Sequence, residues 1–517
     1  MKKTDISINT RGEKEDFLKP WEKSIGACHA YTLLREDVRQ HFKMIHSDCG
    51  METIRCHGLF NDDMQVVKRN YKGELEFSFF NIDNIYDWLL SIGMKPFIEL
   101  SFMPECLASD PTKTVFHYKG IVSLPKDMNE WDELIKAFVS HIEERYGKEE
   151  VRKWYFEVWN EPNLGGDIMN FQTGFFAGTE SQYFDLYSHT AKAIKSIDDK
   201  LMVGGPATSN NRWVKDFVSF CKDNQVPVDF VSTHHYPTDV IFGDNPIATK
   251  EMLEIQKDLN ESEDKEKATQ RLYAFKENIW HYVPRGVCYS MECKAKEEAG
   301  DLPLFYTEWQ SLAGSYSDGA FGASFNTKSA MDSRNLVAGY SYWCGSDVFE
   351  EGGQPSIEFC GAFGLVTYHG IRKAPFNAFQ ILHMMNGRIL KKNWNEDTLD
   401  AYYVEDTNTD YFLLINHNSL SHPIDDCRGT VILQGYEKKI KEIDCYLVDE
   451  EHSNAQRLYR EKFNEKPYLS LDEIKYLKYH SSLYHKKVYS FSRKDGNTSI
   501  KYSLAKYGTL LFAIKHR

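Results

Sequence analysis

The stretch "RKWYFEVWNE", Arg152–Glu161, is followed after a loop by "YFDLYSHTAKAIKSI", Tyr183–Ile197, and this pair sets the pattern of the chain. The first stretch is rich in aromatic and β-branched residues, which favour a strand. Residues 160–163, "NEPN", end that strand, because proline cannot donate to a ladder and asparagine suits turns. In the second stretch apolar residues recur every three to four positions, which is typical of an amphipathic helix. We therefore predict a strand–helix unit over residues 152–197.

Seven further units of this kind lie along the chain. Their predicted strands are Ser24–Tyr31, Met51–Gly58, Lys95–Ser101, Leu201–Ala207, Val228–Tyr236, Leu302–Trp309 and Tyr340–Phe349. Each is followed by a helical pattern, and strands that alternate with helices pair in parallel. Eight consecutive units predict an α/β fold of the closed (β/α)8 TIM-barrel type. An open doubly wound sheet is the alternative.

The pattern changes after Gly387. The strand candidates that follow are short and joined by polar turns: "LDAYYVED", "DYFLLINHN", "GTVILQG", "EIDCYLVDE", "KVYSFSRK" and "TLLFAIKH". Such a series is typical of a β-sandwich. We predict a barrel over residues 21–387, an accessory C-terminal β-sandwich-like domain over residues 388–517, and an N-terminal segment, residues 1–20, that joins the β domain.

Composition excludes several classes of function. The net charge is −14 without a long basic run, which disfavours a nucleic-acid partner or an anionic membrane. No apolar stretch approaches the roughly 20 residues of a membrane span, and the first residues lack the apolar segment of a secretory signal. Eleven irregularly spaced cysteines indicate reduced thiols. We expect a cytoplasmic protein with no membrane partner. The sequence does not decide between a monomer and a homo-oligomer.

Cofactor motifs are also missing from the sequence. It contains no H-E-x-x-H, no P-loop and no G-x-G-x-x-G, so the usual signals of metal hydrolysis, phosphoryl transfer and dinucleotide chemistry are absent. We expect no metal and no cofactor.

Polar side chains end several of the predicted strands. They are Arg55, His57, Asn160, Glu161, His234, His235, Tyr236 and Glu308, with Trp343, Asp347, Glu350 and Glu351 on and after the last strand. Active sites of these barrels lie at the carboxyl ends of the strands. We therefore expect these side chains to converge on one cleft.

Two of these residues, Glu161 and Glu308, are carboxylates, and in the predicted barrel they would lie on opposite sides of the mouth, as glycoside cleavage requires. One carboxyl must protonate the leaving oxygen, and the other must attack the sugar or activate water from its far face. Arg55 and Tyr236 would donate to Glu308 and keep it ionised. Glu161, close to Trp159, would have its pKa raised into the range of an acid.

Two further side chains fit a sugar, and each candidate also has a purely structural reading. Asn160 would donate to the sugar 2-hydroxyl, and Trp343 would stack on the ring. Arg55 would otherwise form an ion pair, the histidines and Trp343 would be core, and the acidic pair Glu350 and Glu351 would face water. Each such reading is common alone. The occurrence of all these side chains together at successive strand ends favours a functional site instead.

The motifs "RCHGLFNDDM", "FEVWNEPNL", "STHHYP", "FYTEWQS" and "YWCGSDVFEE" resemble clan A of the glycoside hydrolases and, within it, family 39, the β-xylosidase family. The likeness runs in order from about Gly26 to Gly387. It implies retention of configuration, with Glu161 as acid/base and Glu308 as nucleophile. It also implies sugar-site positions, namely His57, Asn160, His234, Tyr236, Trp343, Glu350 and Glu351.

Two loops depart from the family pattern. The loop after Glu161 is longer, and within it Phe176 is matched to the aromatic wall of the family's site. The loop after Glu308 carries extra residues, and within it Tyr316 is matched to the family's tyrosine. Both loops border the expected cleft, so they bear on substrate preference more than on chemistry.

The resemblance predicts an exo-acting β-D-xylosidase that takes xylo-oligosaccharides from the non-reducing end. β-Glucosidase and α-L-arabinopyranosidase activities on the same site are alternatives, since one hydroxymethyl group is worth only a few kcal/mol of discrimination. An iduronidase-like activity ranks low, because the obvious cation, Arg55, is assigned to Glu308. A non-catalytic carbohydrate-binding protein on the same fold is the alternative from another class.

Overall fold

The computed structural model describes residues 2–165, 174–243, 245–261 and 264–516. Within these residues, eight parallel strands form a closed barrel: β4 (Ile25–His29), β5 (Thr53–His57), β8 (Lys95–Leu100), β11 (Tyr155–Val158), β12 (Met202–Thr208), β13 (Phe230–His235), β14 (Leu304–Trp309) and β15 (Gly339–Tyr342). Each lies within a predicted strand or overlaps it. The predicted (β/α)8 barrel is confirmed, and the open sheet is excluded because β15 pairs with β4.

Helices cover the outside of the barrel. They are α1 (Glu36–Cys49), α2 (Phe80–Ser91), α3 (Met128–Tyr146), α4 (Lys148–Val151), α5 (Glu180–Ile197), α6 (Val214–Asp223), α9 (Val287–Ala299), α10 (Ala320–Ser333) and α11 (Ala374–Met384). Helix α5 begins with a capping box, in which Thr179 and Gln182 each bond the other's backbone N–H. Its apolar stripe packs Tyr183 and Tyr187 into the core.

The interior of the barrel is built in two layers. Phe97, Phe230 and Phe305 form an aromatic floor with ring centroids 5.3 to 5.9 Å apart, and Tyr155 lies against it. Side chains two positions along a strand share a face. The next inward positions above this floor are therefore polar, at Glu99, Glu157, Ser232 and Thr307. The floor closes one end of the barrel, and the polar layer begins the functional end.

The chain after the barrel forms two facing sheets. One contains β20 (Cys427–Gln434), β23 (Phe491–Lys494) and β24 (Asn497–Leu504), and the other contains β16 (Arg388–Leu390), β17 (Trp394–Glu396), β18 (Leu399–Glu405), β19 (Thr409–Asn416), β21 (Glu442–Val448), β22 (Tyr484–Lys487) and β25 (Thr509–Lys515). Apolar residues of both sheets, such as Val431 and Phe412, form a common core. Helices α12 (Ala455–Phe463) and α13 (Leu471–His480) fill the charged interval between β21 and β22.

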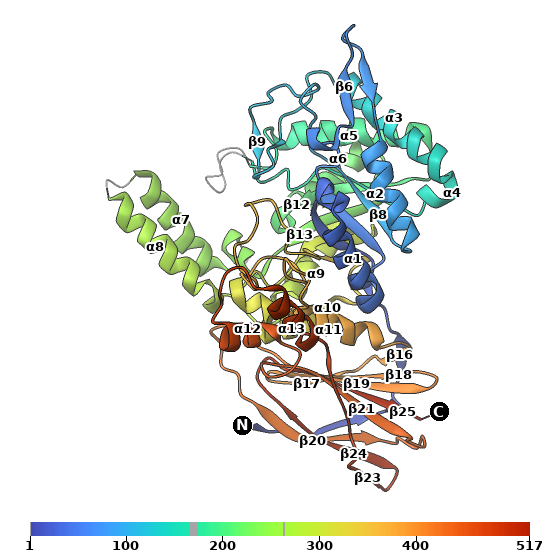
Figure 1. Cartoon of the computed structure of the whole chain (residues 1–517), viewed down its shortest axis with the longest axis vertical. Coiled ribbons are helices and arrows are strands. Elements are labelled where there is room, and N and C mark those ends of the chain that lie inside the picture. Colours follow the sequence, from blue (N-terminus) through green and yellow to red (C-terminus); the bar gives the residue numbers. More distant parts are fainter. Residues whose placement is uncertain (1, 166–173, 244, 262–263, 517) are drawn as a thin grey trace.

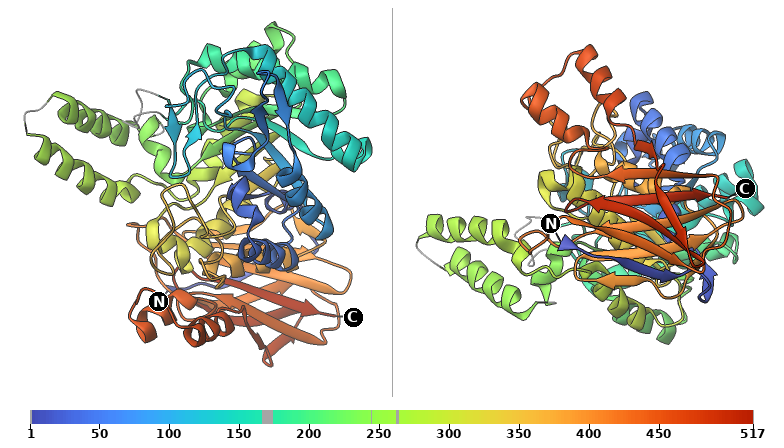
Figure 2. Two further views of the ribbon diagram at one scale, coloured as in Figure 1. Left: turned by 45° about the horizontal axis from the view of Figure 1, so that its top comes forward. Right: turned by 90° about the horizontal axis from the view of Figure 1, so that it is seen from below.

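The first residues of the chain join these sheets. Strands β1 (Lys2–Lys3) and β2 (Ile6–Asn9) pair with β20, and β3 (Lys14–Asp16) pairs with β16. In the view from below, the blue N-terminal strand lies along the orange and red ones (Figure 2). The expected single strand "KVYSFSRK" is divided, because β22 and β23 belong to different sheets. Strand β24 lies outside the predicted strands, and its alternating burial packs Ile500 and Tyr502 inward.

A helical hairpin projects from the barrel (Figure 1), formed by α7 (Pro246–Glu261) and α8 (Lys265–Asn278) between β13 and α9. Two small β-hairpins, β6 (Val67–Arg69) with β7 (Leu75–Phe77) and β9 (Thr114–Val115) with β10 (Gly120–Ile121), lie in the loops that follow β5 and β8. Among the described residues, none of the helices is both long and apolar enough to cross a membrane.

Candidate active site

Glu161 and Glu308 come together at the carboxyl ends of β11 and β14. One carboxyl oxygen of Glu161, one of Glu308 and one ring nitrogen of His234 all lie within 4.8 Å of one another. Glu161 is 6% exposed and Glu308 is 5% exposed. The backbone that delivers Glu161 is strained, with φ of +71° at Trp159 and +42° at Glu161. Such a conformation costs ~1–3 kcal/mol per residue. It is held by hydrogen bonds from Trp159 Nε1 to Phe175 O and from the Glu161 N–H to Ala207 O.

Glu308 is surrounded by donors. Arg55 Nη1 donates to its Oε1 at 2.9 Å, and the Tyr236 hydroxyl donates to its Oε2 at 2.9 Å. Asp239 accepts from the backbone N–H of Tyr236 and so helps to fix that ring. Burial raises the pKa of Glu308, whereas the charges of Arg55 and His57 lower it, and the balance lies at about 7. Glu308 can therefore ionise near neutral pH.

The Arg55 guanidinium is completely buried, and each of its three nitrogens donates a hydrogen bond to a side-chain oxygen. Its Nε contacts Glu157 at 2.6 Å, and its Nη2 contacts Glu99 at 2.8 Å and Asn160 Oδ1 at 2.9 Å. Burial opposes the charge of Arg55, but the three carboxylates of Glu157, Glu99 and Glu308 raise its pKa. The bond to Asn160 turns the amide oxygen toward Arg55 and so fixes the orientation of that side chain.

His57 has a carboxylate at both ring nitrogens. Nδ1 lies 2.7 Å from Glu99, and Nε2 lies 3.5 Å from Glu351 and 3.6 Å from Glu308. A neutral imidazole would turn a lone pair toward one of these acceptors, so the geometry favours the imidazolium. Burial lowers the pKa of His57, but Glu99, Glu351 and Glu308 together raise it to about 10. His57 thus supplies a second cation beside Glu308.

Glu161 has a different environment. Its Oε1 lies 3.0 Å from His234 Nδ1. Burial and the charge of Glu308 raise the pKa of Glu161 well above its ordinary range. Burial and the nearby Arg55 lower the pKa of His234 well below its ordinary range, which favours the neutral imidazole. The pair therefore consists of one carboxyl that ionises first, Glu308, and one that keeps its proton, Glu161.

Trp343 and the acidic pair border the same group. The Trp343 ring lies 4.6 Å from the His57 ring and under the Arg55 guanidinium at 5.7 Å. A side chain at Gly26 would collide with this indole, since a Cβ there would lie 2.1 Å from it. Glu351 faces His57, whereas Glu350 lies 3.5 Å from His29 Nδ1.

The structure does not bring every candidate to this site. Phe176 is fully buried between Trp159 and Tyr183, so it is core; its neighbour Phe175 is the ring that contacts Phe116. Phe116 in turn stacks on His57 with centroids 5.9 Å apart. Residues 166–173 of this loop lie outside the described residues.

Three other candidates also lie apart from the carboxyl pair. Tyr316 is 60% exposed in the turn Gly314–Asp318, so most of its side chain faces solvent. Asp347 is buried beside Lys373 instead of facing the barrel mouth, at 2.8 Å. His235 points to Met291 of α9, as strand alternation predicts.

Three residues of this group are not among the predicted site residues, and two of them lie inside strands, not at strand ends. Glu99 and Glu157 lie within β8 and β11, and both bond Arg55. The signal was present, since each follows an inward aromatic residue, Phe97 or Tyr155, by two positions. His29 at the end of β4 was also missed; it contacts Asp63 at 3.1 Å and stacks on Tyr118 at 3.9 Å.

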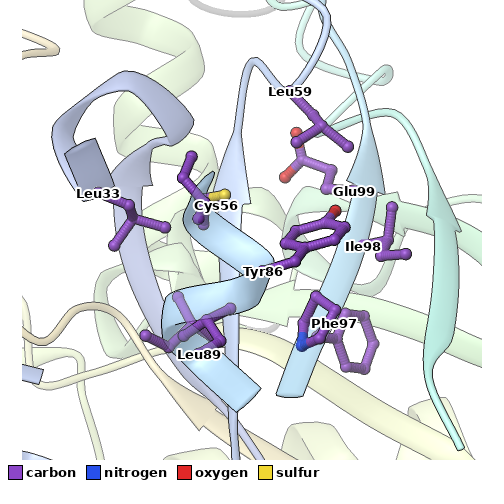
Figure 3. Close-up of a pocket in the computed structure, with 11 residues that line it drawn as sticks. Leu33, Cys56, Leu59, Tyr86, Leu89, Phe97, Ile98 and Glu99 are labelled. Atoms are coloured by element: carbon purple, nitrogen blue, oxygen red, sulfur yellow. The ribbon is translucent and has the colours of Figure 1, made fainter. Parts of the chain in front are cut away.

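Two other features of the described residues, a compact group of metal-ligand types and a small internal cavity, do not alter this arrangement. Among the described residues, Glu161, His234 and Glu308 are the group compact enough for an ion, but the guanidinium 2.9 Å from Glu308 opposes a cation there. The cavity in Figure 3 holds about 10 Å³ between α2 and strands β5 and β8. It is lined mostly by apolar side chains such as Leu33 and Leu89, and it has room for about one water.

Comparison with known proteins agrees with the motifs. The model of the family "Glycosyl hydrolases family 39" matches residues 4–284 and 285–498. The chain is 42% identical over 489 residues to a β-xylosidase of Caldicellulosiruptor saccharolyticus, covering 93% of this chain and 92% of that one. It is 36% identical over 404 residues to a β-xylosidase of Geobacillus stearothermophilus, covering 76% and 73%.

A solved structure shows the same architecture. The GH39 β-xylosidase from Caulobacter crescentus superposes with a TM-score of 0.76 at 28% identity, covering all of both chains. Family model, full-length relatives and fold agree, and the resemblance seen in the sequence is confirmed. The chain belongs to glycosyl hydrolases family 39 and is a glycoside hydrolase.

Proposed function

We propose that this enzyme is a retaining, exo-acting β-D-xylosidase that releases xylose from the non-reducing end of xylo-oligosaccharides. Two relatives that align with most of the chain are β-xylosidases, which supports this substrate class. The charges of the site support a neutral sugar, because Arg55 and His57 are each already paired with carboxylates. A uronate would need a cation with no such partner.

The observation that carries the proposal is the short separation of two unlike carboxyls. Retaining enzymes hold the pair ~5–5.5 Å apart, whereas inverting enzymes hold it ~6.5–9.5 Å apart to admit a water. One carboxyl oxygen of Glu161 and one of Glu308 lie within 4.8 Å of each other, which leaves little room for a water between them and so supports double displacement. Glu308, ionised beside Arg55, attacks the anomeric carbon as the glycosidic C–O bond breaks, and Glu161 gives its proton to the departing oxygen.

The second step reverses these roles. Glu161, now a carboxylate, takes a proton from water, and the water oxygen displaces Glu308 from the anomeric carbon. Two inversions give net retention. We assign the surrounding side chains His57, Asn160, His234, Tyr236, Trp343, Glu350 and Glu351 to the sugar site, with Arg55 holding Glu308. Phe175 replaces Phe176 as the aromatic side chain on the wall.

The test has two parts. Aryl β-xyloside, β-glucoside and α-L-arabinopyranoside are compared by kcat/KM, and the xyloside should be preferred. A 2-fluoro-xyloside should then label Glu308, and Glu308→Ala should abolish turnover. A higher kcat/KM for the glucoside or the arabinopyranoside would reassign the sugar. A label on Glu161 would overturn the roles, and no hydrolysis of any glycoside would favour a binding protein.

We further propose that the enzyme acts in the cytoplasm on short imported oligosaccharides. All eleven cysteines are free thiols, including exposed Cys293 and Cys360. Thiols persist in a reducing compartment, whereas disulfides form in oxidising ones. Localisation of a tagged full-length chain tests this, and recovery of the enzyme from the medium would contradict it.

A further inference from the structure

A chain of hydrogen bonds leads from a buried ion pair to Glu161. Arg55 Nε bonds Glu157 Oε2 at 2.6 Å, and the Thr307 hydroxyl lies 2.8 Å from Glu157 Oε1. Thr307 Oγ1 also lies 3.1 Å from His234 Nε2, and His234 Nδ1 lies 3.0 Å from Glu161 Oε1. The hydroxyl and the imidazole are fully buried, so water does not exchange freely for these partners.

The direction of each bond follows from counting protons. The carboxylate of Glu157, paired with Arg55, can only accept, so the one hydroxyl proton of Thr307 goes to Glu157. Thr307 must then accept from its other partner, which places a proton on His234 Nε2. A neutral imidazole carries one N–H, so Nδ1 bears a lone pair. The hydrogen bond between Nδ1 and Glu161 must therefore use a proton that belongs to Glu161.

We propose that Glu157 and Thr307 are positioning residues that fix the Nε2–H tautomer of His234 and thereby keep the acid/base Glu161 protonated in the free enzyme. This inference rests on the proposed role of Glu161 and explains how that role is secured. Neither positioning residue need touch the substrate. Thr307 acts through His234, and Glu157 acts through Thr307 while it also holds Arg55.

The charges around Glu161 agree with this arrangement. The groups that face it come from four parts of the barrel: His57 on β5, His234 on β13 with Asp239 in the short 3-10 helix that follows, Glu308 on β14, and Glu351 after β15. Burial and the acidic groups raise the pKa of Glu161, and the charge of His57 opposes them. For His234, burial and the cations Arg55 and His57 all lower the pKa, which disfavours an imidazolium that could donate through Nδ1.

The fixed tautomer serves both steps. When Glu161 has given its proton to the departing oxygen, its carboxylate faces the Nδ1 lone pair without a donor there. That contact keeps the carboxylate basic, so it readily takes a proton from the attacking water. His234 itself gains and loses no proton, and the proton taken from water restores the bond from Glu161 to Nδ1.

The experiment compares Thr307→Val, which keeps the shape and removes the hydroxyl, with Thr307→Ser, which keeps the hydroxyl. Thr233→Val is the matched control, because Thr233 is a buried threonine beside His234 that donates to Thr208 O. The ¹⁵N-histidine NMR spectrum is recorded for each full-length protein. The chain has 18 histidines, and the signals of His234 are assigned as those that disappear from the spectrum of His234→Gln. The pH profile of kcat/KM is measured in parallel.

Wild type should show a neutral His234 with Nε2 protonated. Thr307→Val should populate the Nδ1–H form and move the basic limb of the profile down by about one pH unit, the size of one buried hydrogen bond. Thr307→Ser and Thr233→Val should match wild type. An Nδ1–H or doubly protonated His234 in wild type would overturn the proposal, as would an unmoved basic limb in a folded Thr307→Val.

The spectrum also separates this inference from the proposed function. The tautomer of His234 is read from the resting wild-type protein and needs no turnover. The wild-type spectrum therefore tests the proposal even when Thr307→Val does not fold. Labelling by the 2-fluoro-xyloside reports on Glu308 alone. A label on another residue would reject the proposed roles, whereas a correct label with the wrong tautomer would reject only the positioning chain.

Discussion

Removing the Tyr236 hydroxyl should make the enzyme selectively weaker at low pH. In Tyr236→Phe the ring remains, but Glu308 Oε2 loses the donor that lies 2.9 Å away. In the proposed mechanism Glu308 acts as the carboxylate, and this hydrogen bond stabilises the charged form. Its loss must therefore raise the pKa of Glu308, and the acid limb of the pH profile must move upward.

The size of the shift follows from the contact. A buried hydrogen bond to a charged group is worth ~1.5–3 kcal/mol, and one pKa unit corresponds to ~1.4 kcal/mol. The pKa of Glu308, about 7 in the wild-type site, should rise by roughly one to two units in the variant. At about pH 6 the ionised fraction then falls by roughly 10- to 100-fold, and the deficit narrows as the pH rises.

The assay is the pH dependence of kcat/KM on an aryl β-xyloside, since that ratio reports on the free enzyme. Tyr306→Phe is the control, because Tyr306 is a buried tyrosine on the same strand as Glu308 whose hydroxyl donates to Asn211. Its acid limb should stay in place. A ratio of wild-type to Tyr236→Phe activity that is constant with pH would refute the reasoning, because the hydroxyl would then not act on the ionisation of Glu308.

Three further outcomes are expected. Glu161→Ala should cripple cleavage of natural xylo-oligosaccharides far more than that of a dinitrophenyl xyloside, and azide should speed the variant and give the β-xylosyl azide; an α-azide product would indicate inversion. Lys373→Met should lower Tm, because it leaves Asp318 and Asp347 buried without their cation at a cost of ~3–5 kcal/mol. Lys391 forms an exposed ion pair, so the control Lys391→Met should change Tm little, and equal shifts in Tm for the two variants would contradict this. Activity should survive exhaustive treatment with EDTA, and a loss that added metal reverses would exclude the metal-free mechanism.

The fold could be predicted because its signals are local. Each barrel strand is a short apolar run before an amphipathic helix, and the ends of these runs place Glu161 and Glu308 without any knowledge of contacts. Phe176 shows where this reasoning stops. Phe175 and Phe176 are adjacent and identical in type, so the loop conformation alone decides which ring turns inward. Asp347 was misplaced because its partner Lys373 is 26 positions away.

The buried charges explain why Glu161 is the carboxyl that keeps a proton. Two cations, Arg55 and His57, lie among four buried carboxyls, namely Glu99, Glu157, Glu161 and Glu308, and the partly exposed Glu351 lies 3.5 Å from His57. Arg55 contacts three of these carboxyls directly, and Glu161 is the one it does not contact. An ionised, unpaired carboxylate in the interior is costly enough that such a group takes up a proton instead. The sequence shows four glutamates of the same kind, but only their distances from Arg55 divide them into three carboxylates and one acid.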